Sequence, residues 1–229
     1  MRTCLYTYCS KAYIEGLDKA LSTMKAHNDL DNIDIIIASF DIDNYPGAKV
    51  IKPLSEDWTK YAIDGFLLDY DRVAYFQSDE LYLGSIDYLL RGDLKPFAYV
   101  ANGEWGGPCL YNGVKHVHTG GMVIHPKLLP NAHAQLKAIS EDTNRDPCGR
   151  PANTDQDYFT EWLYKYNIDF EVLPHIYSMA KRYYVKDRDT WDKLKSDIRV
   201  LHYVGSPKPW EGDEFGYESL GGVWRRGAF

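Results

Sequence analysis

The chain lacks two features that would each indicate a class of function: a long apolar run and an excess of basic residues. Acidic residues number 33 and Lys plus Arg number 26, so the formal net charge is −7. Nucleic-acid binding needs a basic surface, and this charge balance argues against it. One local Lys or Arg could still bind a small phosphorylated ligand. No run of 18 apolar residues exists, so no transmembrane helix is expected.

Cysteines are few and lack the spacing of a metal site. The four of them, Cys4, Cys9, Cys109 and Cys148, form no CxxC pair. The first residues, MRTCLYTYCSKAY, are too polar for a secretory signal. Reduced thiols and a cytoplasmic location are therefore expected.

Strand-like and helix-like patterns alternate over the first 100 residues. The expected strands are Arg2–Tyr8, Ile33–Ala38, Lys49–Leu54 and Arg72–Phe76, and the expected helices are Lys11–Asn28 and Ser55 to about Tyr70. The run IDIIIA is apolar throughout, which is typical of a central strand covered on both faces. This order predicts an α/β fold with a mostly parallel sheet flanked by helices.

The second half is less regular. Expected strands are Phe97–Ala101, Thr119–Ile124, Phe170–Leu173 and Arg199–Val204, with a loop over Asn102–Gly113. Thr154 and Asp157 form a weak capping box before an aromatic helical segment. The length suits a single core, and no repeat or linker divides the chain, so one α/β domain over residues 1–229 is expected.

The stretch YFQSDELYLG places a carboxylate, Asp79, just after the strand that ends at Phe76. Ligands of open α/β sheets bind at the carboxyl ends of strands. Asp79 and the amide oxygen of Gln77 could both bind a hard cation such as Mg²⁺ or Mn²⁺. The same residues could instead form only a solvated turn, and the stretch alone leaves both interpretations open.

A second stretch, LHYVGSPKPW, combines several residues suited to a phosphate or metal site. His202 could provide a ring nitrogen to a metal, and Gly205 allows close backbone approach. Lys208 is a compact positive charge suited to a phosphate. Pro209 and Trp210 would fix the loop against the protein. This string is far less frequent by chance than a lone His.

The sequence resembles the glycogenin-like (family eight) glycosyltransferases along most of its length. The similar segments are TYCSKAYIEGLDKAL, YDRVAYFQSDELYLGSIDYLL, HTGGMVIHP, TDQDYF, FEVLPHIYS and HYVGSPKPW. Their order and spacing fit the family. The resemblance implies a single GT-A type domain with a mixed, mostly parallel central sheet. It places the nucleotide-binding half at about residues 1–100 and the half for the acceptor and sugar at about 101–229.

The family resemblance implies transfer of a hexose, glucose first and galactose second, from a UDP-sugar with retention of anomeric configuration. It also implies a Mn²⁺ (or Mg²⁺) cofactor and a glycan or glycoprotein acceptor, while the acidic charge balance excludes a nucleic-acid partner. The implied metal ligands are Asp79, His202 and Gln77, and the implied catalytic residues are Asp155, Gln156 and Lys208. The implied donor contacts are Thr7, Tyr13, Lys60, Gln77, Ser78, Asp79, His118, Thr119, Gly205 and Lys208.

The sequence departs from the family pattern at two positions. Gln77 replaces the first acid of Asp-x-Asp, which should weaken metal binding because an amide brings no charge. His118-Thr119-Gly120 stands where the family has Asn-Ser-Gly. A literal Asp-x-Asp, Asp41 and Asp43, follows the second strand, and a solvated loop is the favoured interpretation there.

Three interpretations of the function stay open. The first is a metal-assisted retaining glycosyltransferase, in which Lys208 is exposed at the cleft and stabilises the leaving diphosphate. The second is a non-catalytic module that binds a UDP-sugar or a glycan, and the third is a slow UDP-sugar hydrolase. Asp155 could act beside the sugar or could simply be an acid at a helix N-terminus. Trp105 is the best candidate for stacking on a sugar.

Overall fold

The computed structural model describes residues 1–55, 60–101, 116–142, 155–212 and 218–229 of the chain. Its main sheet has seven strands in the order β3-β2-β1-β4-β7-β6-β8. These are β1 (Thr3–Tyr8), β2 (Ile33–Ala38), β3 (Lys49–Ile51), β4 (Arg72–Tyr75), β6 (Phe97–Ala101), β7 (Val117–Ile124) and β8 (Phe170–Leu173). Strand β7 is antiparallel to both neighbours and the other pairs are parallel, which confirms the predicted mixed, mostly parallel α/β sheet.

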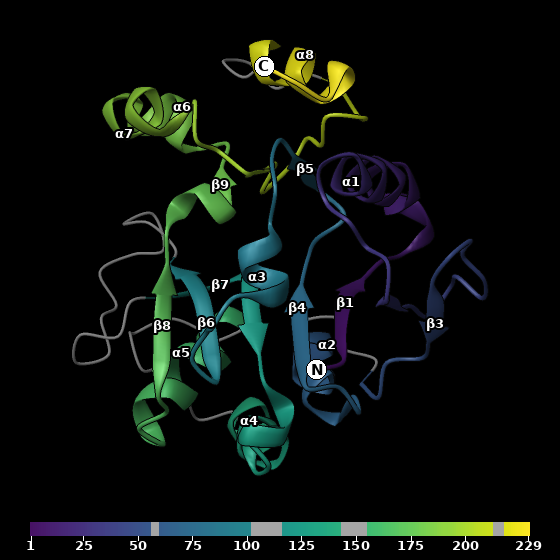
Figure 1. The fold of residues 1–229 in the computed structure, drawn as a ribbon, viewed down its shortest axis with the longest axis vertical. Helices are drawn as coiled ribbons and strands as arrows, with labels where there is room; N and C mark the ends of the chain where they lie inside the picture. The colour runs from purple at the N-terminus through teal and green to yellow at the C-terminus, as the bar shows by residue number, and fades with distance from the viewer. Residues whose placement is uncertain (56–59, 102–115, 143–154, 213–217) are drawn as a thin grey trace.

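The chain reverses its direction of travel across the sheet next to β1. It runs from β1 outward to β2 and β3, and then returns to the other side of β1 as β4. Both β2 and β4 pair with β1 in parallel, so the carboxyl ends of the three strands lie together. A crevice forms at such a switch point because the connections leave in opposite directions. In Figure 1, β1 and β4 both point toward the end of the molecule that carries α1 and α8.

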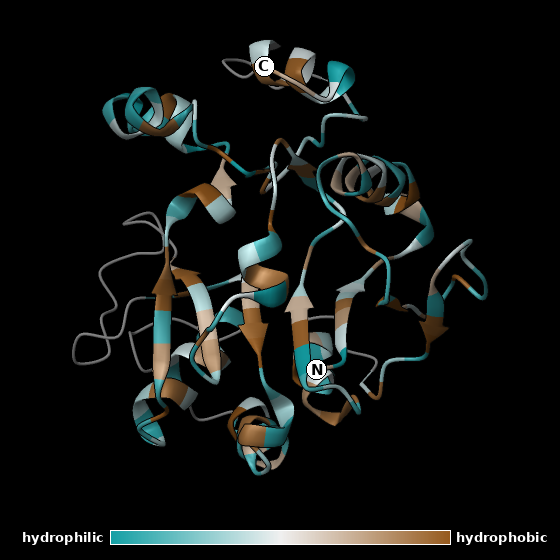
Figure 2. Cartoon of the chain, in the orientation of Figure 1, coloured by the Kyte–Doolittle hydropathy of each residue, from teal (hydrophilic) through white to brown (hydrophobic). Residues whose placement is uncertain are grey.

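Helices cover both faces of the sheet. One face packs against α2 (Tyr61–Asp64), α4 (Ala132–Glu141) and α5 (Asp155–Lys165), and the other packs against α1 (Ile14–His27) and α3 (Asp87–Arg91). The apolar residues of β1 alternate between these two cores, with Tyr6 on one side and Leu5 on the other. Brown, or hydrophobic, stretches are visible along β4 and β7 in Figure 2, whereas β1 is paler.

A smaller sheet lies beyond the carboxyl ends of β1 and β4. It has the order β5-β10-β9, built from β5 (Glu80–Tyr82), β10 (Val200–His202) and β9 (Met179–Ala180). Helices α6 (Tyr183–Lys186), α7 (Arg188–Leu194) and α8 (Glu218–Arg226) enclose a third apolar cluster with it. This sheet matters for function because it joins the stretch after β4 to the stretch that contains His202.

Short one-turn helices complete the elements. They are η1 (Lys11–Tyr13), η3 (Gly65–Leu67), η5 (Pro126–Leu128) and η6 (His175–Tyr177). The long helix predicted from Ser55 to about Tyr70 is wrong in extent. Residues 56–59 lie outside the described residues, and in the described remainder of this range the helix is limited to α2 and η3, because Tyr61, Ala62, Ile63 and Phe66 are all buried and the chain turns away at Leu68. Strand β7 begins two residues before the predicted start.

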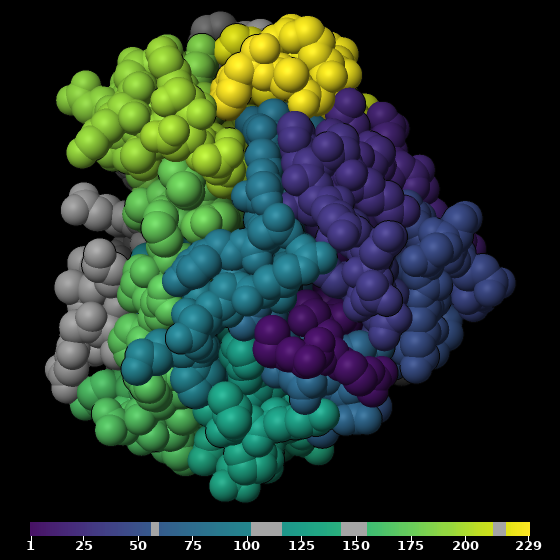
Figure 3. All heavy atoms as spheres, viewed as in Figure 1, coloured from purple at the N-terminus to yellow at the C-terminus, as the bar shows by residue number. Residues whose placement is uncertain are grey.

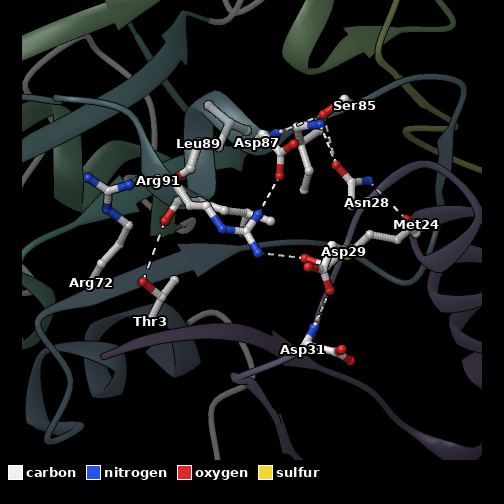
Figure 4. Close-up of polar contacts among 12 residues, drawn as sticks. Thr3, Met24, Asn28, Asp29, Asp31, Arg72, Ser85, Asp87, Leu89 and Arg91 are labelled. Atoms are coloured by element: carbon white, nitrogen blue, oxygen red, sulfur yellow. Dashed lines mark hydrogen bonds and ion pairs between the residues drawn. The ribbon is translucent and has the colours of Figure 1, made fainter. Parts of the chain in front are cut away.

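A polar network joins the end of α1 to the start of α3 (Figure 4). Asn28 Nδ2 donates to the Met24 carbonyl at 2.9 Å, and Asn28 Oδ1 accepts from the Ile86 backbone N–H at 2.7 Å. Arg91 extends the network by donating to the Asp29 carbonyl at 2.7 Å. On the surface, α1 and the chain around α3 therefore lie side by side (Figure 3). No helix in the described part of the chain is both long and apolar enough to span a bilayer.

Candidate functional site

A cavity of about 580 Å³ opens at the carboxyl ends of β1 and β4. Residues from six parts of the chain line it: Tyr8, Cys9, Ser10, Tyr13, Tyr61, Gln77, Ser78, Asp79, Thr119, Asp155, Gln156, His202, Val204, Gly205 and Lys208. Cavities of about 300–1,000 Å³ hold small ligands and cofactors. The two stretches singled out in the sequence, at 77–79 and 202–208, form facing parts of its wall.

The pairing of β5 with β10 brings these two stretches together. Glu80 lies opposite His202 in the antiparallel register, and the Tyr203 N–H donates to the Asp79 carbonyl at 2.9 Å. Asp79 directly precedes β5, and Lys208 lies in the loop that leaves β10. Gly205 turns that loop with a φ of +85°, a conformation that side chains larger than hydrogen rarely adopt.

Asp79, His202 and Lys208 form a buried polar cluster at the cavity wall. The Lys208 ammonium is in direct contact with Asp79 Oδ2, and His202 Nε2 lies 3.3 Å from Asp79 Oδ1. Burial acts to raise the pKa of Asp79, but His202 and Lys208 together outweigh it and hold this pKa well below its usual value. Asp79 is therefore an ionised carboxylate with a positive charge beside it.

Lys208 is 7% exposed, which corrects the expectation of an exposed lysine at the cleft. Its ammonium also donates to the Tyr203 carbonyl at 3.2 Å and lies 5.7 Å from the centre of the Tyr13 ring. The reason is the short loop after β10, which folds the lysine back over the strand end. Two of its three N–H groups thus have oxygen acceptors among the described residues.

Gln77 lines the cavity but does not point its amide nitrogen at Asp79. Its Nε2 donates to Thr119 Oγ1 at 3.3 Å, and its backbone N–H donates to Glu80 Oε2 at 3.0 Å. Ser78, between them, is buried at the cavity wall. The stretch 77–79 is therefore held from several sides, which a solvated turn would not be.

Asp155 and Gln156 face the cavity from the first turn of α5. Burial raises the pKa of Asp155 to about 6, and hydrogen bonds from Thr119 and the Gln156 N–H oppose the rise. The residue is buried, yet it lines the cavity. A carboxyl group in such surroundings changes charge near neutral pH, which is a property of many functional carboxylates.

Tyr13 forms the rim of the cavity. It is 37% exposed, and the Trp210 ring packs against its edge with ring centres 5.7 Å apart. Trp210 in turn contacts Trp224 of α8 at 5.5 Å. Trp210 thus holds the Tyr13 ring from one side and is itself held by Trp224, so the exposed part of Tyr13 offers a fixed flat surface to a ligand.

His118 and Glu80 lie behind the cavity wall. His118 Nδ1 is 3.1 Å from Ser178 Oγ, and its ring centre is 4.8 Å from that of His202. Burial, with His202 as a second cause, holds the pKa of His118 well below its usual value. Burial also raises the pKa of Glu80, opposed by hydrogen bonds from Gln77 and Tyr82. His118 is not among the cavity-lining residues, since Thr119 faces the cavity instead.

Two further predicted donor contacts are not brought to the cavity. Thr7 is fully enclosed in β1, where its hydroxyl donates to the Tyr8 carbonyl at 3.3 Å. Lys60 lines a separate cavity of about 250 Å³ with Asp64 and His133. Its neighbour Tyr61 lines the main cavity, because consecutive helical residues point about 100° apart.

The two acids of the literal Asp-x-Asp are exposed, as the interpretation of a solvated loop predicts, and neither lines the cavity. Asp41 is exposed and accepts the Lys11 N–H, and exposed Asp43 pairs with Lys52 at 3.3 Å. Cys4 and Cys9 are free, as expected. Burial raises the pKa of the cavity-lining Cys9 to about 12, which makes it an unreactive thiol. Trp105, Cys109, Cys148 and Thr154 lie outside the described residues.

Several residues of the cavity were not predicted from the sequence, namely Tyr8, Cys9, Ser10, Tyr61 and Val204. A signal for three of them was present. Tyr8, Cys9 and Ser10 follow the first strand directly, and strand carboxyl ends at a switch point line ligand sites. Glu80 was missed because nothing local distinguishes it from a turn acid.

The side chains at Asp79 and His202 fit a divalent cation in part. A separation of 3.3 Å between Asp79 Oδ1 and His202 Nε2 suits two ligands of one ion with bonds of about 2.1 Å. No group of three or more His, Cys, Asp or Glu side chains with metal-site geometry occurs in the described ranges. The protein thus offers one carboxylate and one imidazole, so further ligands would have to come from a bound molecule.

Three solved glycosyltransferase structures share the fold of this chain. The glycosyltransferase GlyE of Streptococcus pneumoniae superposes with a TM-score of 0.69 at 19% identity, over 99% of this chain and 59% of its own. The galactosyltransferase LgtC, solved with donor and acceptor sugar analogs, gives 0.72 at 17% identity, over 99% and 95%. The bifunctional glycosyltransferase WbbM gives 0.68 at 15%, over 99% and 51%.

At these identities the likeness shows a common fold, the GT-A type that the sequence predicts. The chain spans about three fifths of the length of GlyE. The sequence matches no protein-family model and no curated protein.

Proposed function

We propose that the chain is a retaining glycosyltransferase that transfers a hexose, glucose first and galactose second, from a UDP-sugar to a glycan or glycoprotein acceptor. The observation that carries this proposal is the buried pair of Lys208 and Asp79 at the cavity wall, where β1 and β4 end. The shared fold with GlyE and LgtC, and the segments that resemble the glycogenin-like family, support the same function.

Lys208 is the residue we assign to the leaving diphosphate. Breaking the bond between sugar and phosphate leaves negative charge on that group, and a preplaced cation in a partly dry cavity stabilises it. Asp79 and the Tyr203 carbonyl fix the ammonium in position before any ligand arrives. No side chain has to move far, so little of the binding energy is lost in ordering the lysine.

Asp79 and His202 are the residues that would hold a divalent cation, Mn²⁺ or Mg²⁺. Such an ion would neutralise diphosphate charge as a Lewis acid. Gln77 brings no charge to the site, and its amide nitrogen is engaged with Thr119. The protein alone should therefore hold the ion weakly, and donor phosphates would complete its ligands.

Tyr13 and Asp155 are assigned to the two ends of the donor. The supported face of Tyr13 suits a flat base such as uracil. Asp155 and Gln156 line the part of the cavity next to Thr119, where the sugar would lie. A carboxylate there can accept a hydroxyl hydrogen bond or stabilise positive charge developing on the sugar ring.

The test is a panel of UDP-sugars with and without Mn²⁺, in the presence of candidate acceptors. Release of UDP that depends on both the acceptor and an intact Asp79 is the expected result, together with tighter binding of UDP than of GDP. Equal thermal protection by UDP and GDP would contradict the donor assignment.

The same panel separates the other functions. UDP release without any acceptor indicates a hydrolase, and binding without turnover indicates a non-catalytic module. The neutral side chain at Gln77 is the feature that favours these alternatives, because it weakens the metal site.

A further inference from the structure

A second cavity, of about 630 Å³, is bordered by α1 and α8. Its volume lies in the range of cavities that hold small ligands. Its walls come from α1, from Pro209 and Trp210 in the loop after β10, and from Trp224 and Arg225 of α8. Figure 1 shows both helices at the same end of the molecule. The proposed transfer reaction uses none of this space, which we call the outer groove.

The α1 side of the outer groove is a polar stripe. Glu15, Asp18, Lys19 and Ser22 line it, and their spacings of three and four place them on one face of the helix. The opposite face of α1 carries its apolar residues into the core. The packing of α1 against the sheet therefore uses none of these four side chains.

Hydrogen-bonding groups of the stripe are open to a ligand. The Glu15 carboxylate is exposed and has no hydrogen-bond or ion-pair partner within the described part of the chain. Asp18 accepts the Tyr45 hydroxyl at 2.5 Å through one oxygen, which leaves its other oxygen as an acceptor. Lys19 donates to the Arg225 carbonyl at 3.2 Å and has two further N–H groups. The stripe thus presents both acceptors and donors.

Trp210 forms the apolar wall and links the outer groove to the rim of the main cavity. Its ring lies against α1 at Gly16, where a β-carbon would come within 2.5 Å of a ring atom. Its contacts with Tyr13 and Trp224 hold the ring in place, and part of it stays exposed. A fixed indole of this kind offers a flat apolar surface to a ligand.

The formal charges of the outer groove cancel. Its described lining residues include two acids, Glu15 and Asp18, and two bases, Lys19 and Arg225, so an ionic ligand gains little net attraction. A lipid surface does not fit either, because the apolar side of α8 is buried in the third apolar cluster. Sugars combine uncharged hydroxyls with apolar C–H faces, which matches the polar stripe and the Trp210 ring.

We infer that the outer groove is a binding site for a neutral oligosaccharide, namely the part of a glycan acceptor that lies away from the transferred sugar. The two sites are neighbours, since Tyr13 on the rim of the main cavity is two residues from Glu15 in the groove. Binding a remote part of the acceptor would help to hold its reacting end in place. The role as an acceptor site rests on the proposed function, whereas glycan binding by the groove does not.

Binding is tested with the full chain on an array of neutral oligosaccharides, with sialylated and sulfated glycans as anionic counterparts. Ser22→Trp, at an exposed position of α1, fills the groove and should weaken binding of neutral glycans by at least about tenfold. Glu15→Ala should weaken it about tenfold through loss of a hydrogen bond to a charged group. Ser196→Trp, the same change at an exposed serine outside the groove, is the matched control. All three variants should bind UDP as the wild type does.

No binding to any neutral glycan, a preference for the anionic glycans, or unchanged binding by Ser22→Trp would each overturn the inference. Turnover distinguishes it from the proposed function. With an oligosaccharide acceptor, Ser22→Trp should raise KM about tenfold and keep kcat, because it removes binding that the ground and transition states share. If the wild type binds neutral glycans in the groove but turns over no UDP-sugar, the proposed function fails and the glycan site stands. If it turns over a UDP-sugar while Ser22→Trp binds glycans normally, the reverse holds.

Discussion

A buried charge lies near each end of β4, and the two charges are held by different kinds of partner. At its start, the Arg72 guanidinium donates to the backbone carbonyls of Leu89, at 3.4 Å, and Gly92, at the end of α3. Just beyond its other end, Asp79 contacts the side chain of Lys208. Arg72 lies in the neighbourhood shown in Figure 4, remote from the cavity.

The difference separates a structural charge from one that a ligand can use. The carbonyls that hold Arg72 belong to the fold and cannot leave, so this charge closes the end of α3 as a cap. Lys208 lines the cavity and is held by a side chain whose charge a ligand could share. Changes at Arg72 should therefore affect stability alone, whereas changes at Asp79 or Lys208 should affect both binding and stability.

Asp79→Asn should have the largest effect. The change removes the charge that holds Lys208 and, among the described residues lining the cavity, the carboxylate that lies against His202. Turnover of a UDP-sugar should fall on the order of a thousandfold, since more than one contact to the leaving group is lost. Asp43→Asn, in the exposed Asp-x-Asp, is the matched control. Steady-state UDP release by both variants tests this prediction. Normal turnover by Asp79→Asn would show that the catalytic site lies elsewhere.

Arg72→Met should have the next largest effect, on stability only. It leaves the Leu89 and Gly92 carbonyls without their donor in a buried place, which should cost about 3 kcal/mol in the free energy of unfolding. The affinity of the folded protein for UDP should not change. Denaturant unfolding and calorimetry measure the two quantities, with the exposed Arg2→Met as control. A weakened UDP affinity would show that the two ends of β4 are coupled.

Lys208→Met should reduce turnover about a hundredfold, through lost stabilisation of charge on the leaving group. Because Lys208 is buried against Asp79, the variant should also lose roughly 3 kcal/mol of stability, as the buried carboxylate keeps only His202 beside it. Turnover must be measured at a temperature where the variant is folded. If Lys208→Met lost stability but kept full turnover, the pair of Lys208 and Asp79 would serve only the stability of the fold, as Arg72 does.

The features that depend only on residues close together in the sequence were predicted. Strands such as Ile33–Ala38 follow from their apolar runs, and the stretches 77–79 and 202–208 follow from their residue types. The pairing of Glu80 with His202 could not be predicted, because it depends on contact between strands that are 120 positions apart. The burial of Lys208 depends on the same contact.

Helices were predicted least well where burial is complete. Between Tyr61 and Phe66 the apolar residues are enclosed on several sides, so the spacing that indicates a long amphipathic helix is misleading. Helix α8 was also missed, although Leu220, Val223 and Trp224 are buried against the small sheet. Its Gly221-Gly222 pair is a poor helix former, and tertiary packing overrides that preference.

Asp155→Asn should have the smallest effect, and its sign depends on pH. Burial raises the pKa of Asp155 from 3.8 to about 6 in the folded protein. Below about pH 4 the group is protonated in both states, and between pH 4 and 6 only the unfolded chain releases the proton. The stability that protonated Asp155 contributes at low pH is therefore lost as the pH rises through 6. Above pH 6 the folded protein buries the charged carboxylate, which lowers the free energy of unfolding.

Asparagine resembles the protonated form at every pH, so Asp155→Asn should stabilise the protein only where the wild-type group is charged. At pH 7.5 we expect a gain on the order of 3 kcal/mol, since the pKa rises from 3.8 to about 6 and one pKa unit corresponds to about 1.4 kcal/mol, and at pH 4 no gain. Asp157→Asn, two positions along α5 and paired with His116, is the control for loss of charge at the helix start.

The gain should accompany a loss of turnover, because a carboxylate kept at a stability cost in the cavity wall implies use of its charge. Equal unfolding free energies of variant and wild type at pH 7.5 would mean that Asp155 is well solvated and is simply a favourable acid at the start of α5.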